Sequence, residues 1–248
     1  MELIFEDAQV FRRYIEGISV LVDEAEFVLG ETGLSLKATD PSQISLVDFL
    51  LPKKAFKKFD VPQPTKIGVD LNYFSQVIGR AKSGDQVELS LSEDSSKLFV
   101  SFTGSAKRSF SMPLLDLQSA DLPMPRIDFD SEVKVKADCL GDSFKDAALL
   151  STHVQLLVSK GSFIIKANSS KGSMENTYSP KDKSVVSIKA TEDTKAMFPL
   201  DYLVSIAKAT SSDTEVTLKM KTSAPVEISY SIGDGKLQYF LAPRIESD

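Results

Sequence analysis

The sequence predicts an α+β fold in which one unit, antiparallel strands with two helices packed on one face, occurs twice. Two features carry this prediction: similar segments recur at a constant spacing, and helix-like and strand-like patterns recur in one order. Leu71–Phe74 and Leu200–Leu203 each open a helical pattern, and their numbering offset is 200 − 71 = 129. The strand-like segments Leu34–Ala38 and Phe163–Ala167 keep the same offset. The constant offset indicates an internal duplication.

Four segments carry apolar side chains with the 3.6-residue period of amphipathic helices. The first half holds about Ala8–Val22 and about Leu71–Ala81, and the second half holds about Leu140–Leu150 and about Leu200–Ala209. In the first segment, the residues expected to face the core are Phe11, Tyr14, Ile15, Ile18 and Val22. In the last segment they are Leu200, Leu203, Val204 and Ala207.

Most of the remaining sequence alternates apolar and polar residues, which is typical of half-buried strands. Leu98–Phe102 and Val226–Tyr230 are clear examples. Glycine, serine and aspartate separate the strands at four turns, which are Gly30–Gly33, Ser83–Asp85, Glu93–Ser96 and Gly233–Gly235.

A connector at residues 118–127 joins the halves 1–117 and 128–248. Proline cannot continue a strand ladder, so Pro123 and Pro125 predict an extended segment. Leu122 and Met124 are apolar within it. They either attach the connector to the domain surface or form one lip of a groove that binds peptides.

The composition excludes several kinds of site. Of the 248 residues, 42% are hydrophobic and 26% are charged, as in ordinary globular proteins. The single cysteine, Cys139, excludes an internal disulfide, and with the single histidine, His153, it also excludes the usual zinc sites. We therefore expect no metal and no cofactor. Because no segment has the roughly 20 apolar residues of a membrane span and the start lacks a signal-peptide pattern, we expect an intracellular protein without a membrane partner.

The sequence offers little for catalysis. It has neither a GxxxxGK[ST] phosphate loop nor a GxGxxG after a strand. We expect His153 at the end of a helix as a surface or capping residue, and Cys139 just before that helix as a small buried residue. We therefore predict that the chain is not an enzyme. A carboxylate-dependent hydrolase remains the alternative if Asp40, Asp48 and Asp116 converge.

The polar sides of the helices are more basic than the chain, whose net charge is −6. Side by side, such helices would form a mildly positive surface that follows phosphates without reading bases. An ordinary solvated helix face is the other interpretation. The cations of these faces and of the segments beside them are Arg12, Arg13, Arg80, Lys82, Lys145 and Lys208.

Local sequence along nearly the whole chain resembles the DNA sliding clamp family of the proliferating cell nuclear antigen type. Ala38–Val47 (ATDPSQISLV) is similar to the family's most recognisable strand, and Ile67–Asp70 and Leu114–Leu117 are also typical. The ending Leu241–Glu246 (LAPRIE) is the most specific segment, and its arginine and short acidic tail resemble archaeal members.

The resemblance implies the DNA-clamp fold: two similar domains per chain, with sheets outside and two helices of each on the inner face of a ring. A homotrimer would encircle duplex DNA without sequence preference, as a processivity factor. It would tether DNA polymerase and other replication and repair proteins such as nuclease and ligase, and a clamp loader would open it. A subunit of a heterotrimer is an open alternative. The location would be cytoplasmic, on the nucleoid, if the source is archaeal, and nuclear if it is eukaryotic.

The resemblance also assigns roles to residues. The cations named above would face DNA, although Ser19, Gln76 and Gly79 stand where relatives often carry lysine. Subunits would join through Arg108–Leu114 and Glu175–Ser179, with Phe110 and Tyr178 at the interface. The pocket for partner peptides would comprise Gln43, Ile44, Leu46, Leu122, Met124, Pro125, Pro225, Phe240, Ala242, Pro243 and Ile245.

Overall fold

The computed structural model describes residues 1–117 and 122–245, so the connector residues 118–121 and the last three residues of the predicted second domain lie outside it. The chain forms two compact units, which we describe separately. Unit 1 comprises Met1–Gln43, Val47–Pro123 and Ser231–Leu237. Unit 2 comprises Ile44–Leu46, Met124–Tyr230 and Gln238–Asp248. The two main segments meet at Pro123 and Met124, inside the predicted connector.

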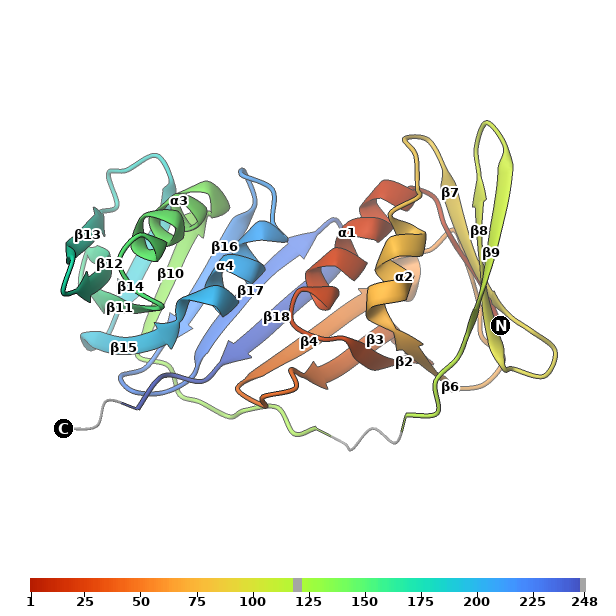
Figure 1. Ribbon diagram of the computed structural model, residues 1–248, viewed down its shortest axis with the longest axis horizontal. Coiled ribbons are helices and arrows are strands. Elements are labelled where there is room, and N and C mark those ends of the chain that lie inside the picture. Colours follow the sequence, from red (N-terminus) through yellow and green to blue (C-terminus); the bar gives the residue numbers. More distant parts are fainter. Residues whose placement is uncertain (118–121, 246–248) are drawn as a thin grey trace. The chain divides into compact units, whose positions relative to one another are not determined.

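Unit 1 has two helices that cross its strands (Figure 1). Its strands form two runs, in the orders β5-β1-β7-β8-β9 and β4-β3-β2-β6. The neighbouring strands are antiparallel in the pairs β1–β5, β1–β7, β7–β8, β8–β9, β2–β3 and β2–β6. The elements are β1 (Glu2–Phe5), α1 (Ala8–Ser19), β2 (Glu24–Gly30), β3 (Gly33–Thr39), β4 (Ser45–Pro52), a 3-10 turn (Lys53–Ala55), β5 (Lys58–Asp60), β6 (Thr65–Asp70), α2 (Leu71–Ile78), β7 (Gln86–Leu91), β8 (Lys97–Thr103) and β9 (Lys107–Pro113).

Unit 2 repeats this arrangement. Its strand orders are β14-β10-β16-β17-β18 and β13-β12-β11-β15. The elements are β10 (Ser131–Lys136), α3 (Ala137–Ala148), β11 (His153–Ser159), β12 (Ser162–Ser169), β13 (Gly172–Tyr178), β14 (Val185–Ala190), β15 (Thr194–Pro199), α4 (Leu200–Lys208), β16 (Glu215–Met220), β17 (Val226–Ile232) and β18 (Gly235–Leu241).

The predicted offset holds beyond the segments that suggested it. Leu71 and Leu200 begin α2 and α4, and Ala8 and Ala137 begin α1 and α3 with the same offset, 137 − 8 = 129. Helix α3 therefore begins three residues before the predicted Leu140. This start is fixed by the partner segment, because the Ala137 and Asp138 amides donate to the carbonyl oxygens of Thr214 and Ser212. Cys139 lies within the helix rather than before it.

Each unit has two runs of strands, whereas the residue pattern alone suggested one sheet per half. In unit 1, the helices pack against β7 of one run and against β2 and β6 of the other. In unit 2, α3 packs against β10 and also against β11, β12 and β13. A helix with a broad apolar stripe can cover two runs of strands, and an alternation pattern carries no information on where one run ends.

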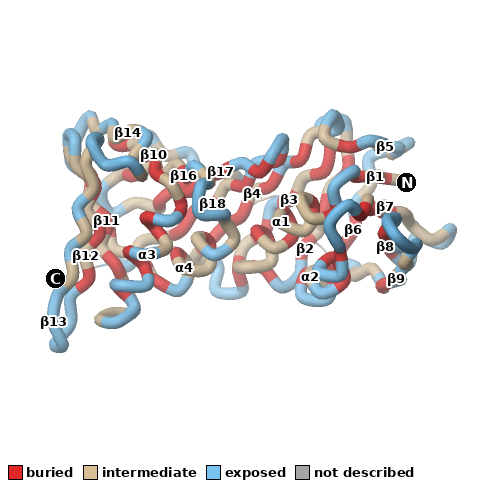
Figure 2. Tube along the Cα trace, turned by 90° about the horizontal axis from the view of Figure 1, so that it is seen from above, coloured by how far each residue is buried: buried red, intermediate tan, exposed pale blue. Residues whose placement is uncertain are grey.

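The predicted apolar faces are buried, with small differences at the helix ends. Phe11, Tyr14, Ile15 and Ile18 of α1 are each at most 1% exposed. The Asp7 carboxylate begins this helix by accepting hydrogen bonds from the Gln9 and Val10 amides. Buried and exposed positions alternate along the strands, as the red and paler segments of Figure 2 show. The α+β prediction is confirmed.

Helix α4 differs most from its predicted face. Ile206 is buried, whereas Val204 and Ala207 are only half-buried. The helix ends at Lys208, and the helices α1 and α2 end at Ser19 and Ile78, each short of its predicted end. Val22 and Ala81, beyond the ends of α1 and α2, are still buried, so the apolar pattern extended past these two helices.

Candidate functional site

The helix pair of unit 1 carries two adjacent arginines on α1. Arg12 is about half-exposed, and its Nε donates to Glu16 Oε1 at 2.6 Å. Arg13 is half-buried beside it. Helix α1 is tied to the turn after α2 by the Gln9 side chain, whose Nε2 donates to the Ala81 carbonyl oxygen at 2.6 Å. The cations of this face therefore lie on a pair of helices that a side-chain hydrogen bond helps to hold together.

The remaining unit 1 cations follow α2. Arg80 and Lys82 are both exposed in the turn after the helix. The turn is closed by amide donation from Arg80 to the Val77 carbonyl oxygen and from Ala81 to that of Ile78. Because helical carbonyl groups end here, the turn combines a partial negative charge from the backbone with two side-chain cations.

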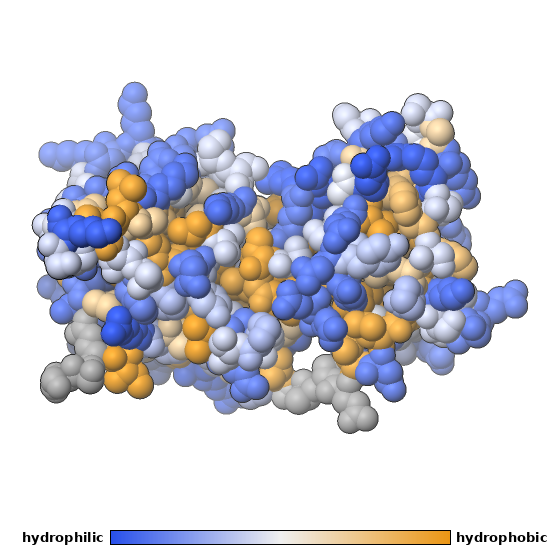
Figure 3. Space-filling view, viewed as in Figure 1, coloured by the Kyte–Doolittle hydropathy of each residue, from blue (hydrophilic) through white to orange (hydrophobic). Residues whose placement is uncertain are grey.

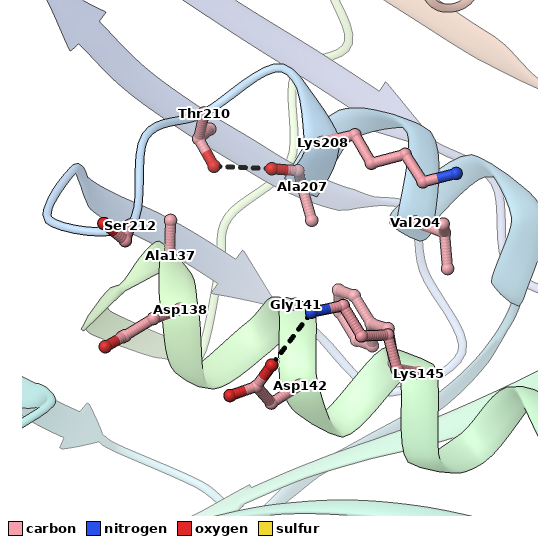
Figure 4. A pocket seen from close by; sticks show the side chains of 11 residues that line it. Ala137, Asp138, Gly141, Asp142, Lys145, Val204, Ala207, Lys208, Thr210 and Ser212 are labelled. Atoms are coloured by element: carbon pink, nitrogen blue, oxygen red, sulfur yellow. Dashed lines mark hydrogen bonds and ion pairs between the residues drawn. The ribbon is translucent and has the colours of Figure 1, made fainter.

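Unit 2 has a pocket of about 310 Å³ between α3 and α4 (Figure 4). Lys145 projects from the α3 side, and its Nζ lies 3.0 Å from Asp142 Oδ1. Lys208 projects from the α4 side. Phe144, Val204 and Ala207 contribute apolar surface between them. Predicted cations thus flank an apolar pocket, and one of them is paired with a carboxylate of its own helix.

Hydrophilic side chains cover much of the surface on the side where the helices lie, with apolar patches between them (Figure 3). All six predicted DNA-facing residues are at least partly exposed. Acids accompany two of them, since Glu16 pairs with Arg12 and Asp142 with Lys145. The helix faces are therefore mixed in charge rather than uniformly basic.

Several predicted docking residues meet within unit 2. The Ala242 amide donates to the Ile44 carbonyl oxygen at 2.8 Å. Gln43, of unit 1, precedes Ile44 with a φ of 58° in a turn where its amide donates to the Asp40 carbonyl oxygen. Leu46 and Phe240 are largely buried, at 9% and 5% exposure, so they support the surface more than they form it.

The chain's end borders a pocket of about 430 Å³. Of the predicted docking residues, Pro243 and Ile245 line it, and Ile245 is 88% exposed. The Arg244 amide donates to the Met197 carbonyl oxygen at 2.7 Å and holds the segment against β15. The sequence did not predict the other lining residues, which are Lys195, Ala196, Met197, Thr222, Ser223 and Arg244.

The other predicted docking residues lie in irregular segments. Leu122, Met124 and Pro125 lie in a part of the connector without strand or helix, where Leu122 and Met124 are half-buried and Pro125 is exposed. Pro225 is half-buried just before β17. No spacing rule brings β15 and the turn before β17 beside the chain's end, because tertiary packing alone places them there.

The two predicted subunit contacts lie on edge strands. In the described part of the chain, β9 ends one five-strand run and β13 ends a four-strand run. Phe110 of β9 is half-buried, with its ring 6.1 Å from that of Phe102. Tyr178 of β13 stacks on Phe163 at 6.1 Å, and its hydroxyl bonds to Ser143 Oγ at 2.7 Å. The Tyr178 side chain is thus anchored within unit 2, while its backbone lies on an edge.

The three carboxylates that a hydrolase would require, Asp40, Asp48 and Asp116, lie in different environments. Asp40 is buried in a turn, where it accepts from the Ser42 amide. Burial raises the pKa of Asp48, opposed by Lys37 and Lys236. Asp116 is exposed after β9. None of the three lines either of the pockets described above.

The single thiol and the single imidazole are both perturbed. Burial, with a contribution from Asp138, raises the pKa of Cys139 to about 12. His153 begins β11 rather than ending a helix, and burial and Arg244 lower its pKa. Among residues 1–117 and 122–245, no group of three or more His, Cys, Asp or Glu side chains is placed to hold a metal ion. None of the helices in this part of the chain is both long enough and apolar enough to cross a membrane.

Comparison with known proteins gives consistent matches along the chain. Residues 1–133 match the family model of the N-terminal domain of proliferating cell nuclear antigen, and residues 123–245 match that of its C-terminal domain. The chain is 36% identical over 248 residues to the DNA polymerase sliding clamp of Thermofilum pendens, covering 99% of this chain and 100% of the relative. It is 33% identical over 246 residues to the DNA polymerase sliding clamp of Thermococcus gammatolerans, and the match covers 99% of this chain and 98% of the relative.

Solved structures agree with these matches. A clamp from Thermococcus kodakaraensis superposes with a TM-score of 0.94 at 25% identity, covering 98% of this chain and 99% of that one. A clamp from A. fulgidus, bound to the C-terminal region of FEN-1, superposes with a TM-score of 0.89 at 27% identity. The match covers 100% of this chain and 99% of that one. The duplicated units, the edge strands and these full-length matches lead to one conclusion: the chain belongs to the proliferating cell nuclear antigen family of DNA sliding clamps.

Proposed function

We propose that this sliding clamp acts as a ring of three identical chains that encircles duplex DNA and tethers DNA polymerase to it. The observation that carries this proposal is that β9 of unit 1 and β13 of unit 2 are two of the strands that end a sheet. Unpaired edges favour addition of another strand, and joining different edges head to tail gives a closed ring when the rotation closes.

Charge supports the pairing of these two edges. Strand β9 begins with Lys107 and Arg108, and Arg108 also pairs with Asp85 of its own chain. Strand β13 carries Glu175, whose Oε2 lies 2.8 Å from Lys166 Nζ of the neighbouring β12. Asp146 lies beside β13, where it accepts from the Asn176 side chain at 3.2 Å. A basic edge facing an acidic edge selects this pairing over contacts between two copies of one edge. We assign Phe110 to the interface through its side chain and Tyr178 through its backbone.

Within the ring, the helices would line the hole. The proposed contacts with DNA phosphates are Arg12, Arg13, Arg80 and Lys82 from unit 1, and Lys145 and Lys208 from unit 2. Such contacts neutralise phosphates without reading bases, so binding would be independent of sequence and sensitive to salt. The proposed two domains are residues 1–117 and 128–248, joined by the connector 118–127.

Partner proteins would dock on unit 2 near the connector. The exposed Ile245 and the half-buried Met124, Pro225 and Pro243 offer apolar surface for short peptide anchors. The A. fulgidus structure, in which a clamp is bound to the C-terminal region of FEN-1, supports peptide docking in this family. We infer that polymerase, nuclease, ligase and a clamp loader compete for this surface. They would do so in the cytoplasm, at the nucleoid, if the cell is archaeal like the relatives' sources.

We further infer that the clamp is a scaffold and not an enzyme. Cys139 lacks a thiolate near neutral pH, because its pKa is raised to about 12. Asp40 is already engaged in its turn, and Asp116 is exposed beyond β9.

Light scattering on the isolated full-length chain tests the ring. The expected mass is three times the 27.2 kDa of one chain. The substitution Phe110→Asp would place a charge in the proposed apolar contact and should give a folded monomer, because burying an unpaired charge is strongly unfavourable. Thr32→Asp, in the exposed turn between β2 and β3 of the other run of strands, is the matched control and should remain a trimer. A wild-type species with the mass of a single chain would contradict the homotrimer and favour a heterotrimer subunit, and a trimeric Phe110→Asp variant would contradict the assigned edge.

A further inference from the structure

We propose that His153 is a positioning residue for partner docking. Its neutral imidazole accepts a hydrogen bond from Arg244 and holds this guanidinium at the rim of the pocket of about 430 Å³ beside the chain's end, the chain-end pocket, where it donates to carbonyl oxygens of a docked peptide. Protonation of His153 removes the acceptor and weakens docking. The inference rests on the proposed function, in which partner proteins dock on this part of unit 2. It adds a residue that is not one of the lining residues described above.

Arg244 is held at two points. Its amide donates to the Met197 carbonyl oxygen at 2.7 Å, which attaches the backbone to β15. Its Nη1 lies 3.4 Å from Nδ1 of His153, at the start of β11, which is the strand that pairs with β15. The side chain therefore reaches across β15 to the neighbouring strand. Because Arg244 also lines the chain-end pocket with Pro243 and Ile245, this second contact sets where its guanidinium lies at the pocket.

The chemistry of the contact determines the state of the imidazole. A guanidinium group donates hydrogen bonds and cannot accept them. Nδ1 of His153 is therefore the acceptor, and the single ring proton of the neutral form is on Nε2. Thr152 Oγ1 lies 3.0 Å from the same Nδ1 and fits this state, because a hydroxyl group can donate to it. A second ring proton would turn Nδ1 into a donor that faces the donors of Arg244.

The charges around the imidazole favour its neutral form. Burial and the cation of Arg244 lower the pKa of His153, and Asp201 in the first turn of α4 only partly opposes them. A lowered pKa means that the ring is neutral at neutral pH and takes up its second proton in acid. The contact with Arg244 is therefore intact at neutral pH and is lost as the pH falls.

The duplication shows what the backbone bond requires. Leu115 stands for Arg244, since 244 − 115 = 129, and Gly68 stands for Met197, since 197 − 68 = 129. The Leu115 amide donates to the Gly68 carbonyl oxygen at 2.9 Å, which is the same backbone bond as in unit 2. A leucine side chain forms no hydrogen bonds, so the segment is attached in unit 1 without any side-chain contact of this kind.

The histidine also has a counterpart in unit 1. Glu24 stands for His153, since 153 − 24 = 129. The contact between imidazole and guanidinium is therefore an addition in unit 2, where the attached segment lines the chain-end pocket. This association points to placement of the Arg244 guanidinium rather than to attachment of the segment.

Two substitutions separate the acceptor from the charge. His153→Asn supplies an amide oxygen as an acceptor near the position of Nδ1, and this amide does not titrate. His153→Lys supplies a permanent cation beside Arg244 and so imitates the protonated imidazole. Positioning by a neutral acceptor predicts that the first variant docks partners normally at every pH and that the second docks them poorly at every pH.

The experiment measures the affinity of the full-length protein, without a histidine tag, for a labelled peptide from the cognate polymerase's tail. Fluorescence anisotropy is recorded at pH 8 and at about pH 5, and any histidine of the peptide is replaced by asparagine. Wild-type affinity should fall roughly threefold to tenfold between the two pH values, because one hydrogen bond to a charged group is lost. His153→Asn should bind within about twofold of wild type at pH 8 and keep that affinity at the lower pH. His153→Lys should bind at pH 8 as weakly as wild type does in acid.

Arg244→Ala tests the other side of the contact. It should weaken binding at pH 8 and remove the pH dependence. Adding His153→Lys to it should then change the affinity less than about twofold, because the effects of coupled residues are not additive. His153 is the only histidine in the chain, so carbon-13-labelled histidine gives one ring signal by NMR. The pKa from this signal should be higher in Arg244→Ala than in wild type, because Arg244 lowers it.

Thermal melting and light scattering at both pH values check the fold and the trimer of every variant. The same fall in affinity for wild type and folded His153→Asn would overturn the proposal, and so would tight binding by folded His153→Lys at pH 8. If His153→Lys does not fold, the comparison of wild type with His153→Asn decides. A wild-type protein that does not bind the peptide at pH 8 would overturn the proposed docking surface and this inference with it. Tight binding at pH 8 with an unaltered pH profile in His153→Asn would overturn this inference alone.

Discussion

At the scale of single residues, this clamp places few reactive groups where solvent reaches them. Cys139 is 7% exposed within α3. Burial and the neighbouring Asp138 raise the pKa of its thiol, and a hydrogen bond with Ser184 only partly opposes them. The residue therefore behaves as a small apolar side chain of the helix interior.

The raised pKa of Cys139 predicts slow reaction with thiol reagents. At pH 8, a thiol with a pKa of about 12 has a thiolate fraction about a thousand-fold smaller than one with the ordinary value near 9. Native protein should therefore react with a disulfide reagent at least a hundred-fold more slowly than protein unfolded in guanidinium chloride. Absorbance of the released thiol measures both rates, with Cys139→Ser as the unreactive control. Equal rates in native and unfolded protein would show that the thiol is accessible.

The buried side chains could be predicted from the sequence in α1 but not at every position of α4. The 3.6-residue period found Phe11 and Ile15 correctly, because helix geometry alone decides which side chains share a face. It selected Val204 where the structure buries Ile206. Both are β-branched apolar residues. Ile206 lies with Leu140 of α3 and Leu218 of β16 around a small cavity, and these neighbours are distant in sequence.

At the scale of elements, the sheets are stabilised by charge as well as by apolar burial. Lys189, Glu132, Lys219 and Glu227 are successive partners across β14, β10, β16 and β17. They alternate in sign along one row. Lys189 Nζ lies 3.2 Å from Glu132 Oε1, and Lys219 Nζ lies 2.9 Å from Glu227 Oε1. Opposite charges on directly facing residues stabilise antiparallel strands.

Reversing one charge in this row should destabilise unit 2. Glu132→Lys would set three lysines side by side, and we expect a loss of about 1–2 kcal/mol from two repulsive pairs and one lost ion pair. Glu192→Lys makes the same change of net charge in an exposed loop and should have almost no effect. Thermal melting measures both variants. Equal melting temperatures for the two would mean that the row does not stabilise the sheet.

Element order could be predicted because duplication checks each assignment twice. The start of α2 at Leu71 is supported by the start of α4 at Leu200, and both starts are correct. The division of each unit into two runs of strands could not be predicted, because alternation fixes the faces of a strand but not its neighbours. The edge positions of β9 and β13 likewise depend on neighbours that lie far away in sequence.

At the scale of the whole molecule, the proposed docking surface combines segments that are distant in sequence. The docking residues were predicted from the family resemblance. In the structure, the Ala242 amide donates to the Ile44 carbonyl oxygen, and the Arg244 amide donates to that of Met197. No pattern within one segment predicted Met197 or Thr222 as neighbours of Ile245. Tertiary contacts of this kind become visible only when the strands are placed.

The docking proposal predicts that Met124 contributes to partner affinity. Met124→Ala shortens an apolar side chain of the connector and should weaken binding of a peptide from the cognate polymerase's tail by about 1–2 kcal/mol, or roughly tenfold. The trimer should persist, because Met124 lies outside both edge strands. Isothermal titration measures the affinity, with Val186→Ala, which shortens an exposed apolar side chain of β14 outside the pocket, as the control. Equal affinities for wild type and Met124→Ala would mean that the connector takes no part in docking.

A clamp that is held on DNA because it encircles the duplex should be released when the DNA is cut. Labelled clamp is loaded on nicked circular duplex, and the complex is passed through a gel-filtration column in high salt, where contacts with phosphates are weak. The clamp should stay with the circle and be lost when one restriction cut makes the DNA linear. Loss from the uncut circle at the same rate as from linear DNA would contradict a closed ring.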